Sequence, residues 1–304
     1  MKDWNNYFED YQAYLKLEKN LSDNTADAYM HDLRLLEEFI TGIYELSPEQ
    51  VEMKHIEAFL ATLHDRGHNR TSTARILSGV RSFFNYLLIN DRIQISPTEL
   101  IESPKLSRKL PVVLSVDEIR AILDAIDLST PQGHRNRAMI ETLYSCGLRV
   151  TELVSLRLSD LFFDDGFLRV IGKGNKQRLV PVSREAVKQI GLYLEQRKHL
   201  PQDTKHKDVV FLNNKGRQLS RVMVFLIIKE AVQSAGILKE VSPHTFRHSF
   251  ATHLVQGGAD IRVVQEMLGH ESIATTEIYT HLNKEYLRKT LDNHPLAGMG
   301  DDLD

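Results

Sequence analysis

The sequence predicts a mainly α-helical protein with one small antiparallel β-sheet, divided into two domains. Three observations support this fold class. Apolar residues recur at helical spacing through the first hundred residues, a proline-bracketed basic segment then breaks the pattern, and a strand–turn–strand pattern appears only afterwards. A chain of 304 residues is long enough to bury two separate hydrophobic cores.

The composition is that of an ordinary soluble globular protein. Hydrophobic residues make up 42% of the chain and charged residues 26%, and no stretch approaches the roughly 20 apolar residues that cross a bilayer. The N-terminus holds no apolar run that would serve as a secretory signal. Cys146 is the only cysteine, which excludes an internal disulfide and favours a reducing compartment. We therefore expect a cytoplasmic protein.

The net charge of −3 hides an uneven distribution along the chain. Residues 1–107 carry 11 Lys and Arg against 17 Asp and Glu, whereas residues 108–304 carry the other 27 against 24. Three aspartates lie in the last four residues, so residues 108–300 alone stand at +6. Phosphate binding needs a local basic surface and not a positive total. The composition therefore permits DNA binding without predicting it.

Residues 1–102 are expected to form a helical domain. Apolar residues at helical spacing mark helices around residues 24–40 and 56–63, and a longer one over about 72–89. The side of this longer helix opposite its apolar face gathers small and basic groups: Arg75, Ser78, Arg81, Ser82 and Asn85. Such a face suits a DNA backbone or groove, and an ordinary solvated helix face has the same composition.

Residues 103–115 are expected to form a basic interdomain linker. Pro104 and Pro111 stop helix propagation and bracket three cations. The charge suits a segment that lies along DNA, although a merely solvated linker has the same pattern. A second domain over 116–295 and an acidic tail over 296–304 complete the predicted organisation.

The second domain begins with predicted helices at about 116–126 and 134–145. The period then changes: residues 167–171 and 178–182 have the composition of two strands, joined by a turn over 172–176. A helix follows near 184–198, and helices continue to the end apart from a short apolar run at 209–212. The domain is therefore predicted to be mainly helical with a sheet built on one hairpin.

Several basic residues lie at the expected ends of these elements. Arg149 precedes Glu152 by three residues, so on a helix the carboxylate would orient the guanidinium, whose planar fork matches two phosphate oxygens. Lys173 lies in the hairpin turn, from which an ammonium group can reach a groove. A surface Arg–Glu pair and a solvated turn lysine are the ordinary alternatives, and Lys176 is a second candidate in the same turn.

A denser group follows in the last third of the chain. Pro243 suits the first turn of a helix, which places His244 and Arg247 on one face near a helix N-terminus that favours anions. His270 lies at or just beyond a helix end, because Gly269 is the expected stop signal. Tyr279 follows nine residues later, and spacing alone does not distinguish a nucleophile from a packing residue there.

Taken together and in order, five segments resemble the tyrosine recombinase (phage integrase) family, most closely its Xer branch and the XerD type within it. The likeness covers nearly all of residues 108–295 and extends, less specifically, over residues 1–102, which resemble the family's SAM-like core-binding domain. It implies that residues 116–295 are the catalytic domain. The five segments lie at 147–153, 171–176, 244–254, 268–270 and 278–281. They fill the whole of the family's active-site set: Arg149, Lys173, His244, Arg247, His270 and Tyr279.

The resemblance implies a transesterification. Tyr279 would attack the scissile phosphodiester to form a 3′-phosphotyrosyl link, and reversal by the partner strand's hydroxyl would give a Holliday junction. Arg149 and Arg247 would hold the non-bridging oxygens and stabilise the transition state. His244 would act as general acid–base, and Lys173 would protonate the departing 5′-oxygen. Because one ester replaces another, the bond energy is kept and no nucleotide cofactor is expected. A metal ion is also dispensable if fixed cations stabilise the charge on the phosphate.

The remaining implied roles concern positioning and assembly. His270 would hydrogen-bond the phosphate or position its neighbours, and Glu152 would orient Arg149. Double-stranded DNA with a specific site is the expected partner, bound by a tetramer on two sites that includes a related recombinase. The resemblance also implies chromosome dimer resolution at cell division with an FtsK-type DNA translocase. A final helix at 283–292 would dock on a neighbouring protomer or pack in cis through Tyr286, Leu287 and Leu291.

Three alternatives remain open at this stage. An integrase of a mobile element would use the same chemistry, and a catalytically inactive relative would only bind DNA. A metal-dependent phosphoesterase is the third alternative, since His244 and His248 at i, i+4 could place two ligands on one helix face. His253 and His270 complete its candidate ligand set.

Overall fold

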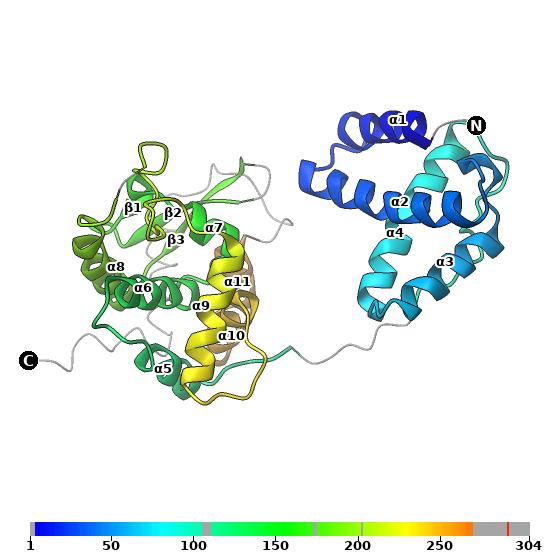
Figure 1. Cartoon of the computed structure of the whole chain (residues 1–304). Coiled ribbons are helices and arrows are strands. Elements are labelled where there is room, and N and C mark those ends of the chain that lie inside the picture. Colours follow the sequence, from blue (N-terminus) through cyan, green and yellow to red (C-terminus); the bar gives the residue numbers. More distant parts are fainter. Residues whose placement is uncertain (1–3, 105–110, 173–174, 202, 270–290, 292–304) are drawn as a thin grey trace, which may run out of the picture. The chain divides into compact units, whose positions relative to one another are not determined.

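The computed structural model divides into two compact units, residues 1–109 and residues 110–304 (Figure 1). It describes residues 4–104, 111–172, 175–201, 203–269 and 291. Each unit buries its own cluster of hydrophobic side chains, as two independent cores require. The helices of the described part include none that is long and apolar enough to span a membrane.

The first unit is a cluster of helices around an aromatic core. Tyr11 and Phe83 contact each other edge to face, with ring centroids 5.3 Å apart, and Trp4 stacks on Phe83. Asn69 begins the last helix of the unit by accepting a hydrogen bond from the backbone N–H of Ser72. The elements are α1 (Trp4–Leu17), α2 (Asp23–Ile43), the 3₁₀-helix η1 (Pro48–Gln50), α3 (Met53–Asp65) and α4 (Arg70–Ile89).

The polar face of α4 differs from a freely solvated one. Arg75 donates a 2.6 Å hydrogen bond to Asp32 of α2, and Arg81 donates to the carbonyl of Ile101. The hydroxyl of Ser82 accepts from the phenol of Tyr11. Ser78 and Asn85, in contrast, are exposed. Three of the five residues of this face therefore have roles inside the unit that the sequence pattern did not indicate.

The second unit is mainly helical with a three-stranded antiparallel sheet of order β1–β2–β3. Helix α6 lies at its centre, packed against α8 and α10, and is buried on nearly all sides. Its helices are α5 (Val116–Asp124), α6 (Pro131–Ser145), α7 (Val150–Ser155), η2 (Leu158–Asp160), α8 (Arg184–Arg197), α9 (Arg221–Ser234), α10 (Pro243–Gln256) and α11 (Ile261–Leu268). Its strands are β1 (Leu161–Phe162), β2 (Phe167–Ile171) and β3 (Gln177–Pro181).

The predicted fold class is confirmed, and the small departures have local causes. Strand β2 matches its predicted bounds, β3 begins one residue early, and β1 extends the hairpin to three strands. Helix α6 begins at Pro131, three residues before the predicted start, because Thr130 caps it by accepting a hydrogen bond from the N–H of Gly133. The apolar run 209–212 forms only isolated bridges, at Val209 and Leu212.

The buried carboxyl of Glu141 in α6 predicts a pH-dependent stability. Glu141 is 2% exposed, and its Oε1 has no hydrogen-bond partner among the described residues. Burial, reinforced by the charge of Glu185, raises the pKa of Glu141 to about 7. The folded protein therefore holds this proton more tightly than the unfolded chain, whose carboxyl titrates near its ordinary value. Stability is accordingly lost as the pH rises from about 4.5 through about 7.

We expect Glu141→Gln to remove this loss, because the amide does not ionise. The free energy of unfolding of each protein is measured by urea denaturation at pH 5 and at pH 8. The difference between the variant and the wild type should shift in favour of the variant by roughly 2–3 kcal/mol from pH 5 to pH 8. Glu195→Gln, which changes an exposed carboxylate, is the control and should show no such trend. A difference between Glu141→Gln and wild type that stays constant with pH would contradict the prediction.

Candidate active site

The first component of the site is Arg149 at the start of α7. Arg149 is the N-cap residue: its backbone N–H donates to Glu152 Oε2 at 2.8 Å, and its Nη1 donates to Glu152 Oε1 at 2.9 Å. The side chain of Glu152 is 2% exposed and that of Arg149 is 36% exposed. The predicted pairing is thus present, and one buried carboxylate fixes both the main chain and the guanidinium of Arg149.

Arg178 in β3 is a second partner of Glu152, which the spacing of residues in the sequence did not predict. Its Nη1 and Nη2 donate to the two oxygens of Glu152 at 2.7 and 2.9 Å, and it is buried. Both ionised partners hold the pKa of Glu152 below its ordinary value, although burial opposes this shift. The alternation of residues in β3 could have indicated Arg178, because it faces the same side of the strand as the buried Val180. A cation at an inward strand position needs a buried anion as its partner.

Arg247 enters the same cluster from α10, which begins at Pro243 as predicted. Its Nη1 donates to the carbonyl of Gly147 at 2.7 Å and lies 3.9 Å from Glu152 Oε2. Burial, together with nearby Arg149, lowers the pKa of Arg247 to about 10, so the group remains charged at neutral pH. Gly147 has a φ of 58°, and an added Cβ there would lie 2.5 Å from the ring of Phe250. The close approach therefore requires glycine.

The end of α11 connects these arginines. Three consecutive carbonyls accept hydrogen bonds from three different guanidiniums: Met267 from Arg178, Leu268 from Arg247, and Gly269 from Arg149. These are the last carbonyls of α11, which have no partner within the helix and carry its negative dipole end. Gly269, with a φ of 67°, ends α11 in the left-handed conformation, as predicted.

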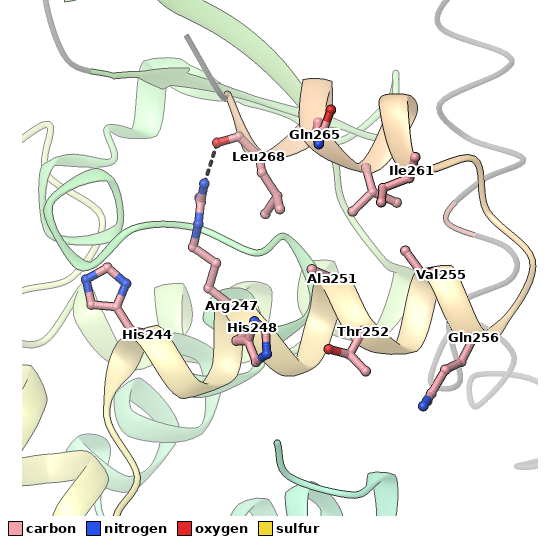
Figure 2. A pocket seen from close by; sticks show the side chains of 11 residues that line it. His244, Arg247, His248, Ala251, Thr252, Val255, Gln256, Ile261, Gln265 and Leu268 are labelled. Carbon is pink, nitrogen blue, oxygen red and sulfur yellow. Dashed lines mark hydrogen bonds between the residues drawn. The ribbon is translucent and has the colours of Figure 1, made fainter. Parts of the chain in front are cut away.

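Figure 2 shows a groove that Arg247 of this cluster lines. The groove, of about 600 Å³, runs between α10 and α11, and His244, Arg247 and His248 lie along its α10 side. The guanidinium of Arg247 points across it toward the carbonyl of Leu268. His244 and Arg247 therefore share a face of α10, as their i, i+3 spacing predicts.

Three predicted site residues, Lys173, His270 and Tyr279, lie outside the described residues. The chain on either side of Lys173 and before His270 is nevertheless placed. The backbone N–H of Gly172 donates to the Lys176 carbonyl at 2.8 Å, and a Cβ added at Gly172 would lie 3.7 Å from Glu152 Oε1. A Cβ added at Gly269 would lie 3.1 Å from Arg178 Nη1. Both segments thus border the Glu152–Arg178 pair.

The charge balance of the cluster suits an anion. One carboxylate faces three guanidinium groups, Arg149, Arg178 and Arg247, so among the described residues two positive charges of the cluster are uncompensated. Arg178 is buried and donates from both Nη groups to Glu152, so its role is to hold that carboxylate inside the protein. Arg149 and Arg247 each have N–H groups that these hydrogen bonds do not use. Two such forks can hold the oxygens of one phosphate group and stabilise charge that develops on them.

The histidines that would serve a metal-dependent enzyme do not form a ligand cluster in the part of the chain that is described. His253 is buried, its Nδ1 lies 2.8 Å from the hydroxyl of Tyr144, and burial lowers its pKa. His253 is therefore a packing residue of the α6–α10 contact. His270, the fourth histidine of that hypothesis, lies outside the described residues.

Comparison with known proteins places this site in a family. The phage integrase family matches residues 112–286, and the phage integrase N-terminal SAM-like domain matches residues 8–90. Tyrosine recombinase XerD of Chlorobaculum tepidum is 44% identical over 292 residues, which cover 94% of this chain and 95% of the relative. Tyrosine recombinase XerD of Listeria monocytogenes is 42% identical, covering 96% of this chain and 100% of the relative.

The chain therefore belongs to the phage integrase family and is a site-specific tyrosine recombinase. Within the family it is similar to recombinases of the XerD type.

Solved structures share the fold. The XerH site-specific recombinase bound to palindromic difH substrate aligns with a TM-score of 0.70 at 24% identity, over 94% of this chain and 83% of that one. A lambda integrase dimer bound to a COC′ core site aligns with a TM-score of 0.68 at 21% identity, over 90% of this chain and 98% of that one. These likenesses extend over both units of the chain.

Proposed function

We propose that this protein cuts and rejoins DNA strands at specific sites through a 3′-phosphotyrosyl intermediate and a Holliday junction, with Tyr279 as nucleophile. The observation that carries the proposal is the cluster of Arg149 and Arg247 around Glu152, which presents two oriented guanidiniums with spare donors. Such preorganised donors stabilise the pentacoordinate transition state of a phosphoryl transfer. The resemblance at residues 278–281 supplies the nucleophile.

The other residues of the set take roles that fit their positions. His244 lines the groove on the same face of α10 as Arg247, which suits a general acid–base that acts on the Tyr279 phenol. Lys173 belongs to the hairpin turn whose Gly172 borders Glu152, from which an ammonium group would protonate the departing 5′-oxygen. His270 directly follows Gly269, whose carbonyl Arg149 holds, and we assign it a hydrogen bond to the phosphate.

The proposed substrate is double-stranded DNA with a specific recombination site. Relatives support this choice: XerH is solved bound to a difH substrate, and lambda integrase is solved as a tetramer bound to a Holliday junction. We propose that residues 1–102 form the core-binding domain, 103–115 the linker, 116–295 the catalytic domain and 296–304 an acidic tail. A tetramer on two sites, formed with a related recombinase, would carry out the strand exchange.

The similarity to XerD recombinases is consistent with a role in chromosome dimer resolution at cell division. We further propose that the protein acts in the cytoplasm and that an FtsK-type translocase activates it. For the final helix predicted at 283–292, docking on a neighbouring protomer and packing in cis are the two expected arrangements. Of this segment the structure describes only Leu291, which is 5% exposed and packed in the core of its own unit. Leu291 therefore supports packing in cis at that position.

The test is a duplex that carries a nick near the cleavage site, which traps the covalent intermediate. The duplex is chosen from genomic fragments that the protein protects. We expect a covalent protein–DNA adduct that forms equally well in excess EDTA, because fixed guanidiniums and no metal ion stabilise the phosphate. Loss of the adduct in EDTA would favour a metal-dependent phosphoesterase. Binding without any adduct would favour an inactive DNA-binding relative.

The genomic position of the protected fragments distinguishes the two biological roles. Fragments at the replication terminus would support the chromosomal role, and fragments at the ends of a mobile element would support an integrase of that element.

A further inference from the structure

The first unit contains a buried carboxylate, Asp32 of α2, that holds an exposed arginine, Arg75 of α4. Asp32 is fully buried, with a side-chain exposure of 0%, whereas the side chain of Arg75 is 50% exposed. The two groups meet at 2.6 Å between Arg75 Nη1 and Asp32 Oδ2. The close approach uses Gly79, where an added Cβ would lie 3.2 Å from Asp32 Oδ2. The arrangement therefore fixes one side of a guanidinium and leaves the other side open.

The Asp32–Arg75 ion pair contributes little to the stability of the fold. Asp32 Oδ1 is buried and has no hydrogen-bond partner among the described residues, so the carboxylate is only half compensated. Burial raises the pKa of Asp32 more than Arg75 lowers it, which means that the ionised form is disfavoured by folding. An ion pair with one half-exposed partner contributes little stability. A buried carboxylate that costs stability at such a place points to a role other than stability.

The surroundings of Arg75 suit a DNA backbone. The first unit is acidic overall, yet α4 contains no Asp or Glu in its 20 residues. A stripe of small polar side chains flanks Arg75 along the outer side of α4, at successive spacings of four and three residues. The stripe consists of Thr71, Arg75, Ser78, Ser82 and Asn85. Small neighbours permit close approach of a phosphate chain to the helix, and Arg75 is the one cation in the stripe.

We propose that Asp32 is a positioning residue for DNA binding, which fixes Arg75 so that its open N–H groups contact a DNA phosphate. This inference rests on the proposed function, since it takes DNA as the substrate. The physical reason is preorganisation: an arginine side chain loses much rotamer freedom when it is held in one geometry, and the buried carboxylate imposes that order before DNA arrives. The design parallels Glu152, which orients Arg149 in the second unit.

The proposal predicts opposite changes in stability and binding. We expect Asp32→Asn to be as stable as the wild type or more stable, with a higher or equal melting temperature, because an ionised buried group is replaced by a neutral one of the same shape. DNA affinity should nevertheless fall about three- to tenfold, since a neutral amide holds the Arg75 guanidinium less firmly than a carboxylate does. If net charge alone determined DNA affinity, the affinity should instead rise, because the substitution removes a negative charge.

The experiment measures the dissociation constant for a genomic fragment that the wild type protects, over a series of salt concentrations, and the melting temperature of each variant. Arg75→Gln should lose affinity and reduce the slope of log K against log salt by about one. Asp27→Asn is the matched control, because it removes an exposed carboxylate from the same helix, and it should bind as the wild type does or slightly more tightly. Asp32→Ala tests the positioning role without an amide that could still hold Arg75.

Three outcomes are informative. Weaker binding by Asp32→Asn or Asp32→Ala at unchanged or increased stability supports the proposal. Unchanged binding by both variants overturns it, and so does a loss of binding that follows a loss of stability, which marks a purely structural role. Adduct formation by the wild type on the nicked duplex is measured in parallel. If the wild type forms no adduct, the proposed function fails, independently of what the Asp32 variants do.

Discussion

Replacement of Tyr279 by phenylalanine is expected to abolish the covalent protein–DNA adduct and to leave DNA binding intact. The change removes only the phenolic oxygen, which is the atom that would become esterified to the 3′-phosphate. The guanidiniums of Arg149 and Arg247 still hold the phosphate, so affinity for the site should change less than about twofold. Because a tyrosine hydroxyl with an ordinary pKa of about 10 needs activation, a distant tyrosine cannot substitute for one placed at the phosphate.

The measurement is denaturing gel electrophoresis of the nicked duplex after incubation with each protein, with a mobility-shift titration as the binding readout. Tyr44→Phe is a matched control, because it deletes the same atom from an exposed tyrosine of the first unit. That variant should form the adduct at the wild-type rate. An adduct formed by Tyr279→Phe at a comparable rate would assign the nucleophile to another residue and would remove the basis of the proposed mechanism.

Replacement of Glu152 by glutamine should damage both folding and cleavage. Glu152 accepts hydrogen bonds from Arg178 and from both the backbone and the side chain of Arg149, and it lies 3.9 Å from Arg247. Removal of its charge leaves three guanidiniums facing one another in a largely buried site. Loss of one partner from a buried ion pair costs about 3–5 kcal/mol. Misplacement of the phosphate-binding arginines should in addition slow cleavage about 100-fold or more.

The free energy of unfolding is measured by denaturant titration and the cleavage rate by single-turnover assays at a temperature where the variant remains folded. Glu195→Gln serves for comparison, since it breaks a 2.7 Å ion pair with Lys198 on the surface and should change stability by less than about 1 kcal/mol. If Glu152→Gln cleaves as fast as the wild type, the carboxylate does not orient the arginines in the way we describe.

Local patterns in the sequence predicted the parts of the site that depend on short spacing. Arg149 and Glu152 are three residues apart, and so are His244 and Arg247, so helical geometry alone places each pair on one face. Gly269 predicted the end of α11 because a left-handed residue commonly terminates a helix. The strand pattern of residues 167–171 gave β2 its correct bounds. In each case the interaction is encoded within a few residues.

Contacts between distant segments were not predictable in this way. Arg178 meets Glu152 across 26 residues, and Arg75 meets Asp32 across 43, so no local spacing relates the partners. The carbonyls that accept from Arg149 and Arg247 are backbone groups, which any residue type supplies. The polar face of α4 was ambiguous for the same reason: Arg81 and Ser82 contact groups of other segments that the helical pattern does not contain. Such pairs become visible only once the helices are packed.

The three carbonyls at the end of α11 link the arginines to one short stretch of main chain. A displacement of residues 267–269 would withdraw an acceptor from Arg178, Arg247 and Arg149 at the same time. The backbone that leads into His270 and the groups that face the phosphate therefore cannot rearrange separately. A force applied to the chain downstream of this stretch would be transmitted to all three guanidiniums together, so a single helix end would be sufficient to make or dismantle the anion-binding centre as one unit.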